Sequence, residues 1–111
     1  MISSVRKFFQ RKPLVVVIRL DGVIGAVSRF GSGGLDDSNT QKLLEKAFEF
    51  EKAKAIAIKI NSPGGSPTQS SLIASRILKL SEEKKIPVLC FCEDVAASGG
   101  YWLACAGEEI Y

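Results

Sequence analysis

Apolar residues form three short, nearly continuous runs along the chain, at residues 14–20, 55–60 and 86–92. The first of them, LVVVIRL, is rich in β-branched residues, and unbroken apolar runs of this length are typical of strands buried on both faces of a sheet. The pattern therefore predicts three strands. Residues 109–111 (EIY) begin a fourth strand by the same criterion.

Segments with helical spacing of apolar residues separate these runs. The first helix is expected to extend to about residue 54, and three residues could cap its start: Asp37, Ser38 and Asn39. It follows a loop rich in Gly, Ser and Asp at 28–39, and two further helices are expected at about 68–84 and at 98–106. This alternation predicts parallel strands joined by right-handed crossovers, an α/β layered fold in βαβαβα order.

Length and composition suit one small globular domain. The 111 residues are 46% hydrophobic, which is enough to bury a core. We expect the domain to span 14–111, after a tail at 1–13. Because a domain rarely finishes on the first residues of a strand, we expect this sequence to be the front portion of a longer domain, truncated at its C-terminal end.

Charge and the N-terminal tail restrict the partners. A net charge of +3 without a dense basic face or a known motif gives no reason to expect a nucleic-acid partner. The tail is basic and carries Phe8 and Phe9, so it is either a peripheral contact with an anionic membrane or an untethered end. The longest apolar run near the start is far shorter than the roughly 20 residues of a membrane-spanning helix.

The chain has three cysteines, Cys90, Cys92 and Cys105, and no histidine. The cysteines are too few and too irregularly spaced for a disulfide framework or a metal site, so buried free thiols are expected and no metal is.

Two loops follow strands at the edge of the sheet where parallel α/β folds bind ligands. The loop at 61–67, NSPGGSP, exposes the consecutive amides of Gly64 and Gly65, which can hold an oxyanion or a ground-state carbonyl. The loop at 93–97 leads into Ser98, which begins the expected third helix beside the Gly99 amide. These residues together are the candidate active site, with Ser98 as nucleophile.

Each feature also has a purely structural explanation. A Pro-Gly-Gly segment after a strand is commonly a turn, and a serine that begins a helix is commonly its N-cap. Glu93 and Asp94 are either a catalytic pair or a solvated approach to the helix. The sequence alone leaves these alternatives open.

Four segments resemble one known family. The sequences NSPGGS (61–66) and DVAASGGYWLA (94–104) are similar to signal peptide peptidase A, the protease IV group of peptidase family S49. VVVIRLDGVI (15–24) and AGEEIY (106–111) are also similar. The resemblance implies a Clp/crotonase-like fold and a serine endopeptidase that cleaves membrane-associated or signal-derived peptides without a cofactor. It also implies a homo-oligomer and a membrane-associated location, with a cytoplasmic location as the alternative.

The resemblance assigns roles by position. Ser98 matches the family nucleophile, and Gly64, Gly65 and Gly99 match the residues whose amides line the oxyanion hole. The family's general base is a lysine some tens of residues downstream, but no lysine follows Lys85 in this chain. Lys59 lies in a strand near the first loop and is interpreted as a strand residue. This chain alone is therefore expected to be inactive.

Two other functions remain open on the same scaffold. One is a non-catalytic S49-like protein used for binding or assembly, which the missing lysine suggests. The other is a crotonase-like acyl-CoA enzyme, in which the same oxyanion hole polarises a thioester; fold alone does not choose between them.

Overall fold

The computed structural model describes residues 13–25 and 34–111. The basic tail at 1–13, apart from Pro13, and the first half of the loop expected at 28–39 lie outside the described residues. The membrane contact expected of the tail lies there too.

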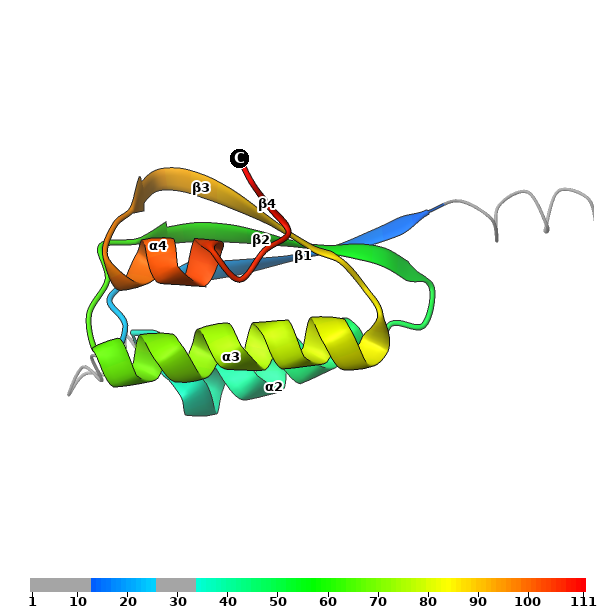
Figure 1. Ribbon diagram of the computed structural model, residues 1–111, viewed down its shortest axis with the longest axis horizontal. Coiled ribbons are helices and arrows are strands. Elements are labelled where there is room, and N and C mark those ends of the chain that lie inside the picture. The colour runs from blue at the N-terminus through cyan, green and yellow to red at the C-terminus, as the bar shows by residue number, and fades with distance from the viewer. Residues whose placement is uncertain (1–12, 26–33) are drawn as a thin grey trace, which may run out of the picture.

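The described residues form a four-stranded, all-parallel sheet in the order β1-β2-β3-β4 (Figure 1). Its strands are β1 (Leu14–Asp21), β2 (Ala53–Ser62), β3 (Val88–Ala96) and β4 (Glu109–Ile110). The register runs straight across the sheet, with Ile18 beside Ile58, Ile58 beside Cys90, and Cys90 beside Ile110. The predicted α/β fold with parallel strands is confirmed, including the short fourth strand.

All three described helices lie on one side of this sheet (Figure 1). They are α2 (Asp37–Phe48), α3 (Pro67–Lys84) and α4 (Gly99–Ala104). Successive crossovers of one hand that always step to the next strand place every helix on the same face. Residues on that face, such as Ile58 and Ile60, are fully buried, whereas Val15 and Val17 on the opposite face are 47% and 59% exposed.

The helix–sheet layer holds the hydrophobic core. Its largest fully buried aliphatic side chains are Leu20, Ile24, Leu44, Ile56, Ile58, Ile60, Ile73, Ile77, Val88 and Leu103. Burial of each such side chain contributes about 1.5–3 kcal/mol to the free energy of folding. Leu103 belongs to α4, so the short helix beside the candidate nucleophile is anchored in the core.

Helix α2 differs from its prediction at both ends. Asp36 is its N-cap, and none of the three expected caps is: Asp37, Ser38 and Asn39. Asp36 Oδ1 accepts from the Asn39 N–H at 2.7 Å while Asn39 Oδ1 accepts from the Asp36 N–H at 3.2 Å, a reciprocal capping box. The helix ends at Phe48 rather than near Lys54, because the chain turns there and β2 already begins at Ala53.

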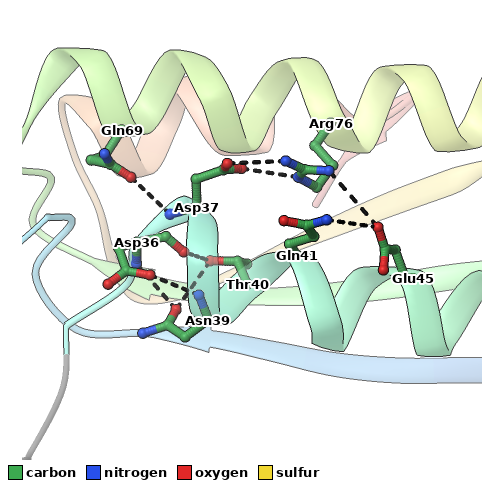
Figure 2. A network of polar contacts seen from close by, with 8 residues as sticks. All are labelled: Asp36, Asp37, Asn39, Thr40, Gln41, Glu45, Gln69 and Arg76. Carbon is green, nitrogen blue, oxygen red and sulfur yellow. Dashed lines mark hydrogen bonds and ion pairs between the residues drawn. The ribbon is translucent and has the colours of Figure 1, made fainter.

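A polar network joins α2 to α3 (Figure 2). The Arg76 guanidinium donates from Nε and Nη2 to the two carboxylate oxygens of Asp37, at 2.9 and 3.0 Å. The Asp37 N–H donates to Gln69 Oε1 at 2.7 Å, and Glu45 lies 4.0 Å from the Arg76 guanidinium. Hydrogen bonds from Arg76 hold the pKa of Asp37 below its usual value. The network fixes α3 and therefore the loop that precedes it.

The three cysteines are free thiols, as expected, but they are not all buried. Cys90 is buried in β3, Cys92 is half-buried, and Cys105 is exposed because it caps the C-terminal end of α4. No helix among the described residues has the length and the apolar character to cross a membrane.

Candidate active site

The loop after β2 is built around two glycines with positive φ, +101° for Gly64 and +153° for Gly65. The Ile24 N–H donates to the Gly64 carbonyl, and the Ser66 N–H donates to the Ile24 carbonyl, both at 2.9 Å. Ile24 and Gly65 thus form a parallel bridge, in which the N–H and C=O of Gly65 point to the opposite edge. A Cβ at Gly65 would lie 2.0 Å from the Ile24 carbonyl oxygen, so only glycine is accommodated.

Ser98 has a strained backbone. Its φ of 52° and ψ of −120° are those of the first central residue of a type II′ turn, a position that glycine favours. The turn is closed by the Gly100 N–H, which donates to the Ala97 carbonyl at 2.9 Å. Ser98 is the N-cap residue of α4 by position, but its side chain makes no capping hydrogen bond. Helix capping therefore does not explain why this residue is a serine. Strain of this kind costs about 1–3 kcal/mol and is concentrated at functional sites.

The two loops meet at one edge of the sheet, as predicted. A Cβ added to Gly64 would lie 2.8 Å from Ser98 Cβ and 2.9 Å from the Gly99 nitrogen. The Ala97 N–H also donates to the Ser62 carbonyl at 3.1 Å, which ties the end of β3 to the end of β2. Gly64 is thus in contact with the serine, and a side chain at position 64 would push the two loops apart.

Two buried serines that sequence reasoning did not single out support this junction. Ser62 and Ser70 are both fully buried. A Cβ on Gly99 would lie 2.3 Å from Ser70 Oγ, and one on Gly100 would lie 2.5 Å from the Ser62 carbonyl oxygen. Ser62 could have been noticed because it stands within the NSPGGS motif; Ser70 had no signal beyond its place on the inner face of a predicted helix.

The second loop is shorter than expected. β3 continues to Ala96, so most of the segment 93–97 is strand. α4 has six residues rather than the nine expected over 98–106, so its dipole adds little at Ser98.

Glu93 and Lys59 belong to an ion cluster rather than to the candidate site. Glu93 Oε2 lies 2.7 Å from Arg19 Nη2 and 4.0 Å from Lys59 Nζ. Lys59 alternates with Ile58 and Ile60, so it lies on the face of the sheet opposite the helices. Lys59 is thus a strand residue, as interpreted. Because Glu93 lies in β3 and pairs with Arg19, it is neither a solvated helix approach nor a partner of Asp94.

Among the residues that the structure describes, no cluster of three or more histidine, cysteine, aspartate or glutamate side chains could hold a metal ion. What the described geometry offers is a strained serine in contact with a glycine loop. In addition, the backbone amides of Gly65 and Gly99 have no hydrogen-bond partner among the described residues. A serine hydroxyl beside unpaired amides suits attack on a carbonyl group with stabilisation of the resulting oxyanion.

Comparison with known proteins identifies the family. The profile of peptidase family S49 matches residues 81–111, a segment that includes Ser98 and Gly99. The chloroplastic serine protease SPPA of Arabidopsis thaliana is 38% identical over 100 residues, which are 86% of this chain and 14% of that protein. The chain belongs to peptidase family S49.

Another relative carries a different name. The Na(+)/H(+) antiporter NhaA of Brucella melitensis is 47% identical over 105 residues, 95% of this chain but 14% of that protein. Most of the protein that bears this name therefore lies outside the aligned segment.

A solved structure shows the same fold. A mutant of the 1510-N membrane-bound stomatin-specific protease aligns with a TM-score of 0.62 at 24% identity, and the alignment covers 89% of this chain and 43% of that one. The S49 chain spans about one seventh of the two curated relatives, at 14% of each.

Proposed function

We propose that this chain is the nucleophile-bearing part of a serine endopeptidase of the signal peptide peptidase A type. The observation that supports the proposal is the contact between the Gly64 loop and Ser98, whose backbone is strained. Ser98 Oγ attacks the carbonyl carbon of a peptide bond, and a lysine takes the hydroxyl proton. Amides of Gly65 and Gly99 are the proposed donors to the oxyanion, each worth about 3 kcal/mol in the transition state. The Gly64 amide, which was also expected to be a donor, instead donates to Ser62 Oγ at 3.1 Å.

Several features support a peptide as the substrate. Small residues surround Ser98, so a substrate backbone can approach its hydroxyl closely. The C=O of Gly65 points away from Ile24, so it can accept a hydrogen bond from the backbone of an extended peptide. The likeness to an enzyme named serine protease SPPA favours peptide hydrolysis over acyl-CoA chemistry.

The general base is proposed to be a lysine outside residues 1–111. No lysine follows Lys85, and Lys59 is held in the Glu93 cluster on the far face of the sheet. A lysine serves as base when burial lowers its pKa to about 7–8, so that it is neutral when the hydroxyl attacks. On this proposal the chain is inactive alone and becomes active in a form extended downstream.

Location and assembly are part of the same proposal. A membrane-associated site of action and a homo-oligomer are proposed from the family resemblance.

The test is labelling with a serine-directed fluorophosphonate, applied to this chain and to a form extended downstream through the next lysines, with the adduct mapped by mass spectrometry. We expect the adduct on Ser98 in the longer form and its loss in Ser98→Ala with folding retained. Ser66→Ala is the matched control, because Ser66 caps α3 through its Oγ and should keep the label. Absence of label from both folded forms would contradict a peptidase and favour the binding relative.

A further inference from the structure

The side chain of Ser62 lies at the junction of the two loops. It is fully buried at the end of β2, where Ser62 pairs with Ala96 of β3. Its Oγ accepts from the Gly64 N–H at 3.1 Å, and its carbonyl accepts from the Ala97 N–H at 3.1 Å. One residue therefore holds the glycine loop with its side chain and the chain before Ser98 with its backbone.

The Ser62 hydroxyl accepts a hydrogen bond from the Gly64 amide, which has no other partner among the described residues. A buried N–H without an acceptor is costly, so the Gly64 amide stays directed at Ser62 Oγ rather than at the space near Ser98. This hydrogen bond spans two residues, the pattern of a serine turn, and it fixes the backbone of Gly64 at its positive φ. The Gly65 amide, next along the chain, is thereby set in place.

We propose that Ser62 is a positioning residue of the candidate active site. Its hydroxyl occupies the Gly64 amide and orients the loop, so that the free amides of Gly65 and Gly99 are the pair left to bind the oxyanion. The inference rests on the proposed function for the role of these amides. The hydrogen bond itself is independent of any activity and can be tested separately.

Amide hydrogen exchange on this chain, followed by nuclear magnetic resonance, tests the hydrogen bond. The Gly64 amide should be protected and the Gly65 amide should not. In Ser62→Ala, exchange at Gly64 should accelerate about ten- to a hundredfold beyond the change at core amides. Ser62→Cys keeps the shape of the side chain with a somewhat larger atom that is a weaker acceptor, so its Gly64 exchange should be intermediate. A Cys variant that exchanges like the wild type would show that Ser62 acts by shape alone and would overturn the proposal.

Ser66→Ala is the matched control for stability. Ser66 lies in the same loop and caps α3, but its side chain does not contact the Gly64 amide. Its loss should alter exchange at Gly64 no more than at core amides. Acceleration specific to Gly64 in this variant would contradict a special role for Ser62.

The functional consequence is measured on the form extended downstream. Ser62→Ala should slow fluorophosphonate labelling of Ser98 about tenfold or more when both variants remain folded, whereas Ser66→Ala should label at the wild-type rate. Unchanged labelling in Ser62→Ala, with Gly64 deprotected, would refute the positioning role. If the wild type itself takes no label, the proposed function fails, while the exchange result still decides whether Ser62 holds the Gly64 amide.

Discussion

The backbone of Ser98 is in a conformation that costs free energy for any residue with a side chain. Replacing Ser98 with Gly should raise the free energy of unfolding by about 1 kcal/mol, because glycine adopts φ 52° and ψ −120° without strain. Urea denaturation checks this.

Ser98→Ala provides the comparison for this prediction. Alanine removes the same hydroxyl but keeps the Cβ and therefore the strain, so its stability should stay close to that of the wild type. Equal stability of the Gly and Ala variants would show that the turn is not strained.

Gly64 and Gly22 form a matched pair that separates backbone strain from crowding. Their φ angles are +101° and +103°, but a Cβ at Gly22 would meet no atom within 4 Å. Gly22→Ala should cost about 1 kcal/mol, the backbone term alone. Gly64→Ala should cost roughly 1–3 kcal/mol more, since its Cβ would contact Ser98 and Gly99.

The two alanine variants should also differ in chemistry. In the form extended downstream, Gly64→Ala should abolish fluorophosphonate labelling of Ser98, and Gly22→Ala should leave it intact. Chemical denaturation and labelling on the same samples measure both effects. Similar losses in the two variants would mean that Gly64 is needed only for its dihedral angles.

The sequence revealed the residue types of this site but not its geometry. The glycines and Ser98 stand in recognisable motifs, so their assignment could be made by position. The positive φ of Ser98 could not, because serine has no intrinsic preference for it and the surrounding turn imposes it. The roles of Ser62 and Ser70 were also hidden, since a buried hydroxyl is recognised only from its contacts.

At the scale of elements, the ion pair between Asp37 and Arg76 makes the α2–α3 packing depend on pH. Hydrogen bonds from Arg76 lower the pKa of Asp37 in the folded state. A lowered folded pKa gives stability that is present above the unfolded value of about 3.9 and is lost as the pH falls through the folded value. Both side chains are partly exposed, so the contribution is about 1 kcal/mol.

Asp37→Asn tests this contribution. The wild type should be more stable than the variant at neutral pH by about 1 kcal/mol, and the difference should shrink as the pH falls below the unfolded value of about 3.9. Thermal unfolding as a function of pH measures it, with Glu51→Gln as the control, because Glu51 is exposed in a turn. A difference that persists unchanged at low pH would assign the effect of the Asp37→Asn substitution to packing rather than to charge.

Strand and helix positions followed from the apolar pattern, whereas their ends did not. β2 and β3 each continue past the apolar run, into Ser62 and Ala96, because the two strands keep pairing there. The start of α2 was displaced because several adjacent residues, including Asp36 and Asp37, can all cap a helix. Tertiary contacts determine which of them is the cap. The Asp37 carboxylate binds Arg76, whereas Asp36 caps the helix.

At the scale of the whole molecule, the order of the elements was sufficient to predict the parallel sheet. Alternating strands and helices with short connections leave few arrangements, and a sheet in sequential order is the simplest of them. It could not be predicted that, among the described residues, no helix covers the second face of the sheet. Continuous apolar runs suggested strands buried on both sides, yet within the described residues Val15 and Val17 are exposed.

The thiols report how this molecule opens as a whole. Cys90 is fully buried in a central part of β3, and burial raises the pKa of its thiol to about 11. Cys105 is exposed. Iodoacetamide at pH 8 should therefore modify Cys105 in the native protein. Cys90 should react only after global unfolding, so without denaturant its modification should be at least about a thousandfold slower than that of Cys105. In urea above the unfolding midpoint the two rates should converge.

Mass spectrometry of peptides containing each cysteine measures both rates in one sample. Modification of Cys90 at a rate close to that of Cys105 without denaturant would show that β3 separates from α4 locally, since Leu103 and Gly107 cover the Cys90 sulfur.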